Sequence, residues 1–134
     1  MGEDIEVIQA DGQILCYIIR RNFRPSHTTF ITPPESKQQV GFIVYPADGT
    51  IPRHSHRALE RHLVGMSEVL LVRDGRCQIE IYDHHQKLVD TRDLHQNDVV
   101  ILVGGGHGFR IQEDTVLLEI KQGPYLGVND KELF

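Results

Sequence analysis

Two histidines one residue apart, His54 and His56, are the first residues in this chain of 134 whose spacing suggests chemistry. In an extended strand residues i and i+2 share one face, so the two imidazoles would point the same way. Glu68 opens a strand-like run further along, and His107 follows in a glycine-rich turn. Neutral imidazoles with one carboxylate suit a divalent first-row transition metal. The four residues therefore predict a metal site, against the alternative that His54 and His56 are only hydrogen-bonded polar residues.

The other five histidines have a simpler interpretation. They fall in expected turns or loops, where we expect them to be solvated: His27, His62, His84, His85 and His95.

Three consecutive glycines at 104–106 precede His107 and could be taken for a phosphate-binding loop. Such a loop needs a helix after it, usually with a lysine and a serine or threonine, whereas a strand-like HGFRIQ follows here. We therefore expect the glycines to form a tight turn that places His107.

The elements that must position these residues are short apolar runs separated by Gly, Pro and Asp turns. They indicate about ten strands and an all-β sandwich or barrel. The expected strands are residues 12–20, 27–32, 38–46, 67–75, 76–83, 88–94, 99–103, 107–112 and 116–122. Asp74-Gly75 is typical of a tight hairpin turn between two of them. Residues 56–65 are the one helical candidate, with a loop as the alternative.

Alternation within the strands predicts which side chains share a face. Cys77, Ile79 and Ile81 lie on one face of their strand. If Glu68 points inward, Leu70 and Val72 do so as well. If His107 points inward, Phe109 and Ile111 share its face.

The last expected strand leaves two possibilities open. Its apolar face is Val116, Leu118 and Ile120, and the other face is Leu117, Glu119 and Lys121. That second face is either a solvated edge or a functional Glu119–Lys121 pair in a cavity, because buried charges usually have a role or a partner. Tyr82, Tyr45 and Arg110 could bind an anionic substrate, with surface placement as the alternative. Glu119, Lys121 and Tyr82 are the candidate catalytic residues.

Composition narrows the class of protein. The length suits one domain with a real core, and a formal net charge of −5 argues against nucleic acid or an anionic membrane as partner. The acidic first thirteen residues do not resemble a signal peptide, and no apolar run is long enough to span a bilayer. Cys16 and Cys77 are expected to be buried thiols in a reducing cytoplasm, with a disulfide as the less favoured alternative.

The motifs resemble those of the cupins, which carry G-x5-H-x-H-x(3,4)-E-x6-G followed by G-x5-P-x-G-x2-H-x3-N. Gly49 precedes His54 and His56 with one residue fewer than the first motif, and Glu68-VLLVRD-Gly75 reproduces its second half. NDVVILVGGGHGF is similar to the second motif, with Asp98 and the apolar run matching and His107 near its last ligand. The resemblance covers roughly residues 40–122.

The chain departs from the family pattern in both motifs. Eleven residues separate His56 from Glu68 instead of three or four, and Glu60 stands at the family's spacing. Glu68 is the preferred ligand because the strand and Gly75 follow it, Glu60 is the alternative, and residues 57–66 are interpreted as an inserted loop or lid. In the second motif Asn97, which tolerates positive φ, replaces the turn glycine. The proline is missing, and Ile111 replaces the final asparagine.

The resemblance implies a double-stranded β-helix, or jelly-roll barrel, in a single domain spanning 1–134. Its core would be residues 38–122, with N-terminal strands in 12–32 and a tail at 123–134. It also implies a divalent transition metal (Fe, Mn, Ni, Co or Zn) held by His54, His56, Glu68 and His107.

The expected function is that of a small cytoplasmic metal-dependent enzyme, an oxygenase or isomerase, acting on a carbohydrate- or carboxylate-like molecule. The alternatives are a non-catalytic metal- or ligand-binding cupin and a metal-independent sugar-nucleotide isomerase or epimerase. We also expect a homodimer, since ILCYIIR at 14–20 resembles a strand able to extend a neighbour's sheet.

Overall fold

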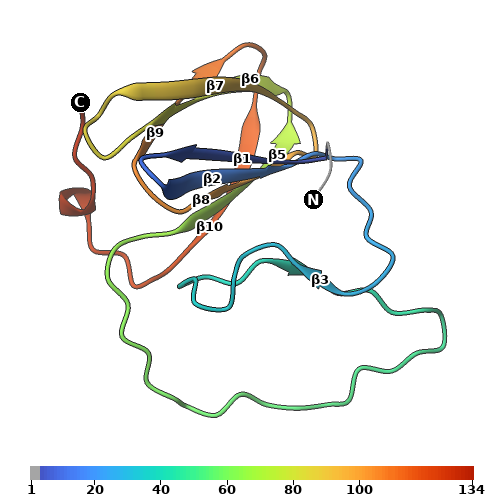
Figure 1. Ribbon diagram of the computed structural model, residues 1–134. Coiled ribbons are helices and arrows are strands. Elements are labelled where there is room, and N and C mark those ends of the chain that lie inside the picture. Colours follow the sequence, from blue (N-terminus) through green and yellow to red (C-terminus); the bar gives the residue numbers. More distant parts are fainter. Residues whose placement is uncertain (1–3) are drawn as a thin grey trace. The chain divides into compact units, whose positions relative to one another are not determined.

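The structure, a computed structural model, describes residues 4–134 in two compact units. The first combines the described residues up to Phe23 with Met66–Phe134, and we call it the strand unit. The second is Arg24–Gly65, and we call it the loop unit. Figure 1 shows that most strands belong to the strand unit, whereas the loop unit is largely extended chain.

The protein is all-β. Its strands are β1 (Ile5–Ala10), β2 (Gln13–Ile19), β3 (Thr29–Phe30), β4 (Gly41–Phe42), β5 (Glu68–Asp74), β6 (Arg76–Tyr82), β7 (Leu88–His95), β8 (Val99–Leu102), β9 (Gly106–Ile111) and β10 (Val116–Lys121). The one helical element assigned in residues 4–134 is a 3₁₀ turn, η1 (Val128–Asp130), so the described chain has no helix able to cross a membrane.

The strand unit consists of two antiparallel sheets. The larger has the order β1-β2-β8-β5-β10, and the smaller has the order β7-β6-β9. Glu68, at the start of β5, lies opposite Leu102 of β8 and Lys121 of β10. His107 of β9 lies opposite Ile81 of β6. The larger sheet therefore supplies Glu68 and the smaller sheet supplies His107, which are two of the four residues that the sequence assigns to the metal.

The core of the strand unit is built from the inner faces of both sheets. Leu15, Ile18 and Val100 from the larger sheet cluster with Ile79 and Leu94 from the smaller, and all five side chains are fully buried. Burying a side chain of this size stabilises a fold by about 1.5–3 kcal/mol. This apolar contact fixes the two sheets against each other and so fixes the residues that they carry.

Alternation predicted the strand unit well. The strands expected at 12–20 and between 67 and 122 are present as β2 and β5 to β10. Leu70 and Val72 point inward, as expected if Glu68 does. The inward face of β6 is confirmed, with Cys77, Ile79 and Ile81 exposed by 1% or less. β1 was not expected.

Both cysteines are buried and free, as the sequence indicated. Burial raises the pKa of the Cys16 thiol to about 12, so it stays protonated and unreactive at neutral pH.

The expected hairpin at Asp74-Gly75 is wrong. β5 pairs with β8 and β10, whereas β6 pairs with β7 and β9, so this turn carries the chain from one sheet to the other. Gly75 has a φ of 90°, and a Cβ there would collide with the backbone oxygen of Asp114. The glycine is therefore required by the change of sheet and not by a two-residue hairpin.

The loop unit differs from the expectation. The strands expected at 27–32 and 38–46 shrink to β3 and β4, which pair over two residues each, and residues 50–64 contain neither strand nor helix. The shared strand face for His54 and His56 is therefore wrong, and the loop alternative for 56–65 holds. Pro52 removes a backbone donor just before the histidines, and the polar residues around them offer no apolar face to bury.

The strand proposed for pairing with a neighbour is also not at an edge. β2 lies between β1 and β8, so both of its sides are already hydrogen-bonded. The edges of the larger sheet are β1 and β10. The homodimer itself stays a prediction.

A buried carboxylate ties the end of β2 to the turn before β8. Asp98 is 2% exposed, and its side chain accepts hydrogen bonds from the backbone N–H of Arg21 and His95 at 2.9 Å and from Arg20 Nη1 at 3.0 Å. The preceding Asn97 has a φ of 72°, which agrees with its expected place in the turn. In this structure Asp98 is an anchor of the scaffold, a role that the motif match alone did not indicate.

Candidate active site

The strand unit contains a cavity of about 760 Å³, within the usual range for small-molecule sites. β5, β9 and β10 provide its walls, together with the turn at 104–106 and the chain at 130–134. Its lining includes apolar side chains such as Leu70, Phe109 and Leu117 beside several ionisable groups. Such a mixture can hold a small polar molecule against an apolar wall.

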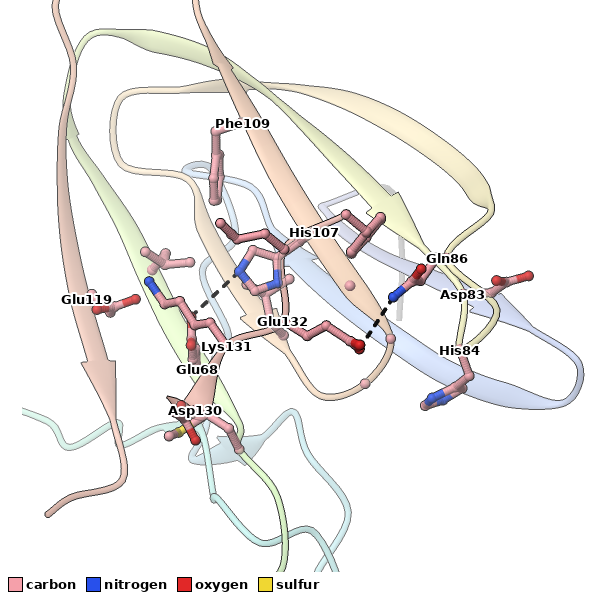
Figure 2. A pocket seen from close by; sticks show the side chains of 18 of the residues that line it. Glu68, Asp83, His84, Gln86, His107, Phe109, Glu119, Asp130, Lys131 and Glu132 are labelled. Carbon is pink, nitrogen blue, oxygen red and sulfur yellow. Dashed lines mark hydrogen bonds and ion pairs between the residues drawn. The ribbon is translucent and has the colours of Figure 1, made fainter. Parts of the chain in front are cut away.

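Glu68 and His107 meet in this cavity (Figure 2). The Nε2 atom of His107 lies 3.8 Å from Oε2 of Glu68, and their side chains are 32% and 13% exposed. Phe109 also lines the cavity, on the same face of β9 as His107, as the alternation predicted. Their ring centroids are 6.0 Å apart. Ile111 at the end of β9 is 58% exposed and does not line the cavity.

The tight turn expected before His107 is present. Gly105 has a φ of 64°, and a Cβ there would collide with the carbonyl oxygen of Tyr82. β9 begins directly afterwards at Gly106, so the turn brings His107 onto the face that lines the cavity.

Glu119 also lines the cavity, which resolves the ambiguity of the last strand. Leu117 and Glu119 face inward, whereas Val116, Leu118 and Ile120 are outside and 47–55% exposed. The inner face of β10 therefore brings a second carboxyl group to the site that already holds Glu68.

The cavity shifts the ionisation of its two central residues. Partial burial, followed by the charge and hydrogen bond of Glu119, raises the pKa of Glu68 above its ordinary value. Burial also lowers the pKa of His107, and the charge of Lys131 adds to this while Glu119 opposes it. A neutral imidazole thus lies beside a carboxyl group that holds a proton more readily than usual, a pairing suited to proton transfer.

The same pair has the chemistry of metal ligands. Nitrogen and oxygen ligands bind zinc at about 2.0–2.2 Å, which puts neighbouring ligands of a tetrahedral ion roughly 3.4 Å apart. The 3.8 Å between Glu68 and His107 is close to this separation. A neutral imidazole is also the form that coordinates a metal. Residues 4–134 present no group of three or more His, Cys, Asp or Glu side chains close enough to hold an ion.

His54 and His56 lie in the loop unit, and their local geometry can be described by itself. Their ring centroids are 5.3 Å apart, and both residues are exposed. Nδ1 of His54 is 2.8 Å from the carbonyl oxygen of Pro52, so Nδ1 carries the proton and Nε2 is free to accept a bond. Metal-binding histidines are commonly oriented in this way. Glu60, the alternative ligand, is exposed in the same stretch of open chain.

The remaining candidates divide between the cavity and its surroundings. The ammonium group of Lys121 lies 3.5 Å from Oε2 of Glu119, and Lys121 lines a neighbouring cavity of about 280 Å³. Tyr82 does not line the larger cavity and instead packs edge-on against Phe134, with 5.0 Å between ring centroids. Of the three expected catalytic residues, only Glu119 lines the larger cavity.

The other two candidates for binding an anionic substrate are exposed. Arg110 is 74% exposed and lies 3.5 Å from Glu80, and Tyr45 is 51% exposed in the loop unit.

The sequence did not reveal the contribution of the chain after β10. Residues 130–134 all line the cavity, and His84, expected to be solvated, is exposed at its rim. No periodic pattern marks residues 130–134, because a segment in irregular conformation has no fixed repeat of inward positions. The lysine and the phenylalanine in this short stretch were the available signals.

No family model matches this chain, and no curated protein or solved structure matches it. The grounds for a function are therefore the cavity of the strand unit and the sequence motifs.

Proposed function

We propose that this protein is a small cupin-type metalloenzyme acting on a carbohydrate- or carboxylate-like molecule in the cavity of the strand unit. The observation that carries the proposal is the approach of Glu68 and His107 to 3.8 Å inside a cavity of about 760 Å³. The two residues come from different sheets, and both occupy ligand positions in the motifs that resemble the cupins.

The proposal includes the double-stranded β-helix as the fold of the strand unit. In its support, the described residues form five strands in one antiparallel sheet and three in another, with one core between the sheets. Eight strands in two such sheets are the number found in a jelly roll.

The metal would be a divalent transition ion, Fe, Mn, Ni, Co or Zn, with Glu68 and His107 as ligands. Such an ion supplies Lewis-acid polarisation of a carbonyl group or activation of bound water. The assignment of His54 and His56 to the same ion stays a prediction from the sequence. The free Nε2 of His54 supports His54 as a ligand of this ion.

The chain's own acid and base groups would then act beside the ion. Glu119 shares the cavity with Glu68 and lies 3.5 Å from Lys121, so its carboxyl group would be the one that exchanges a proton with a bound substrate while Glu68 holds the ion. Leu70, Leu117 and Phe109 form the apolar part of the wall and limit the access of water. Together these groups favour an isomerase or another reaction that moves a proton.

A metal-independent isomerase or epimerase is the second candidate. The lowered pKa of His107 and the raised pKa of Glu68, both caused mainly by burial, favour it, because a neutral imidazole can accept a substrate proton at Nε2 while the carboxyl group donates one. In this case Glu68 and His107 would act directly on the substrate and would not coordinate an ion.

Elemental analysis separates the two candidates. Protein purified without chelator or histidine tag is expected to carry a transition metal in about one-to-one ratio with the chain. Glu68→Gln and His107→Ala are each expected to lose it, whereas His84→Ala, at the cavity rim, is expected to keep it. A wild-type protein without transition metal, even after incubation with each candidate ion, would contradict the metalloenzyme and favour the metal-independent isomerase.

A further inference from the structure

The five residues 130–134, which we call the 130–134 segment, form one side of the cavity although they belong to no sheet. All of them line it; Asp130 is the last residue of the 3₁₀ turn η1, and the other four follow it. Leu133 and Phe134 are nevertheless 92% and 61% exposed, so much of the segment's apolar surface faces away from the protein. Such a segment covers the cavity without being packed into the core.

A small number of contacts hold the segment in place. The ring of Phe134 meets the ring of Tyr82 edge-on at 5.0 Å, an arrangement that aromatic pairs prefer. Gly106 provides the seat, because a Cβ at this position would lie 2.8 Å from the Phe134 ring. Gln86 donates a long hydrogen bond of 3.4 Å to Glu132, which Figure 2 marks with a dashed line, and the backbone N–H of Lys131 donates to the carbonyl oxygen of Val128 at 3.2 Å. Contacts so few can break and re-form at little cost.

Lys131 is the cation that this segment brings to the cavity. Figure 2 shows its side chain pointing inward, on the side of Glu68 and Glu119. Lys121 lies 3.5 Å from Glu119, whereas the neighbour of Glu68 at 3.8 Å is the neutral His107, so the charge of Lys131 also acts on Glu68. Among the ion pairs of the described residues none within 4.0 Å includes Lys131, so an anionic group of a ligand can approach its ammonium group directly.

We propose that the 130–134 segment is a cover that closes over the bound ligand, and that its Lys131 selects ligands carrying a carboxylate or similar anionic group. This inference deepens the proposed function and rests on it for the location of the site. A ligand enters when Phe134 leaves its seat at Gly106 and Tyr82. Once an anion is bound, its attraction to Lys131 holds the segment closed and slows release.

The selection is tested by calorimetric titration with oxalate, malonate and succinate, and with the neutral polyols glycerol and glucose. At least one carboxylate is expected to bind the wild-type protein, and Lys131→Gln is expected to weaken it about tenfold or more, as for the loss of a charged hydrogen bond. Lys131→Arg should restore most of the affinity because it keeps the charge. Lys87→Gln, on the turn between β6 and β7 and outside the lining of the cavity, is the matched control and should bind as the wild type does.

The cover is tested by the rate at which the bound carboxylate leaves. Phe134→Ala and Gly106→Ala should both speed dissociation, the first by removing the ring and the second by occupying its seat. Gly108→Ala is the control on the same strand, since its Cβ would meet only Glu80 at an ordinary distance of 3.5 Å. Circular dichroism of each variant checks that the sheets are intact.

Three results would overturn the proposal: carboxylate binding unchanged in Lys131→Gln, no carboxylate bound by the wild type, or unchanged dissociation in both Phe134→Ala and Gly106→Ala. Metal content measured on the same samples keeps this test separate from that of the proposed function. A protein without metal that still binds carboxylates through Lys131 would refute the metalloenzyme and leave the cover and its lysine in place.

Discussion

The strand unit and the loop unit place their chemically important residues in very different surroundings. Glu68 lies on β5, which is paired with a strand on each side, and His107 lies on β9, which is paired with β6. Both sheets pack on the buried core. His54 and His56 lie in open, exposed chain, in a unit whose strands are two residues long. A sheet determines where a side chain points through its two-residue period, whereas open chain carries no such constraint. The chemistry that can be argued from geometry is therefore that of the strand unit.

The largest expected difference between the two units is in their response to loss of an apolar side chain. Ile79→Ala should lower the free energy of unfolding by about 2–5 kcal/mol, because it leaves a cavity between the two sheets. Leu59→Ala, at a residue of the loop unit that is 65% exposed, should change it by no more than about 0.5 kcal/mol. Urea unfolding followed by circular dichroism measures both. Equal losses would show that the loop unit is packed as firmly as the strand unit.

The anchor at Asp98 should give the next largest effect. Asp98→Ala removes three hydrogen bonds and leaves the Arg20 charge with fewer partners, which we expect to cost about 3 kcal/mol. Glu35→Ala, an exposed carboxylate in the loop unit, should cost about 0–1 kcal/mol. The same urea titration reports both values. A loss at Asp98 no greater than that at Glu35 would mean that the anchor does not stabilise the strand unit.

A smaller effect is expected from pH through Glu6. The hydrogen bond from Arg20 is the main reason why the pKa of Glu6 is lowered, and Arg92 adds to it. A lowered folded-state pKa means that Glu6 contributes stability above its unfolded value of about 4.3, and that this is lost as the pH falls through the folded value. Stability measured from pH 6 to pH 2.5 should therefore fall less steeply in Glu6→Gln than in the wild type. Identical slopes would contradict the assignment, and Glu60→Gln in the loop unit serves as the control.

The smallest effect is expected at the candidate site itself. The raised pKa of Glu68 means that its stabilising contribution is complete below about pH 4.3 and is lost as the pH rises through the folded value. At neutral pH the ionised carboxyl group is thus less favourable in the folded, metal-free protein than in the unfolded chain. Glu68→Gln should raise the midpoint of thermal unfolding at pH 7 in metal-free samples. A lower midpoint would show that the charge of Glu68 is stabilised rather than strained in the cavity.

Alternation was enough to predict most of the strand unit. Alternation placed Glu68, Leu70 and Val72 on one face of their strand, and the structure turns this face inward. His107 could be placed because the glycines before it allow a tight turn and no helix follows. Local patterns suffice where one face of a strand is buried by the core.

The partners of the strands did not follow from local patterns. Asp74-Gly75 resembles a hairpin turn, but whether the chain turns back or crosses to another sheet is decided by contacts distant in sequence, here with Asp114. Local patterns also failed to predict the loop unit, since its apolar side chains Ile43, Ile51 and Leu59 are more than half exposed and do not mark a buried face. The 130–134 segment was missed because an irregular segment positions side chains through a few tertiary contacts, such as Phe134 on Tyr82.

The most direct test of the proposed function is a crystal structure of the tag-free protein with an anomalous diffraction scan across the transition-metal edges. We expect one anomalous peak in the cavity, within about 2.0–2.3 Å of a carboxylate oxygen of Glu68 and of Nε2 of His107. The same map would show whether His54 and His56 bind that ion. A map without a peak in the cavity, or a peak held by neither Glu68 nor His107, would contradict the proposed function.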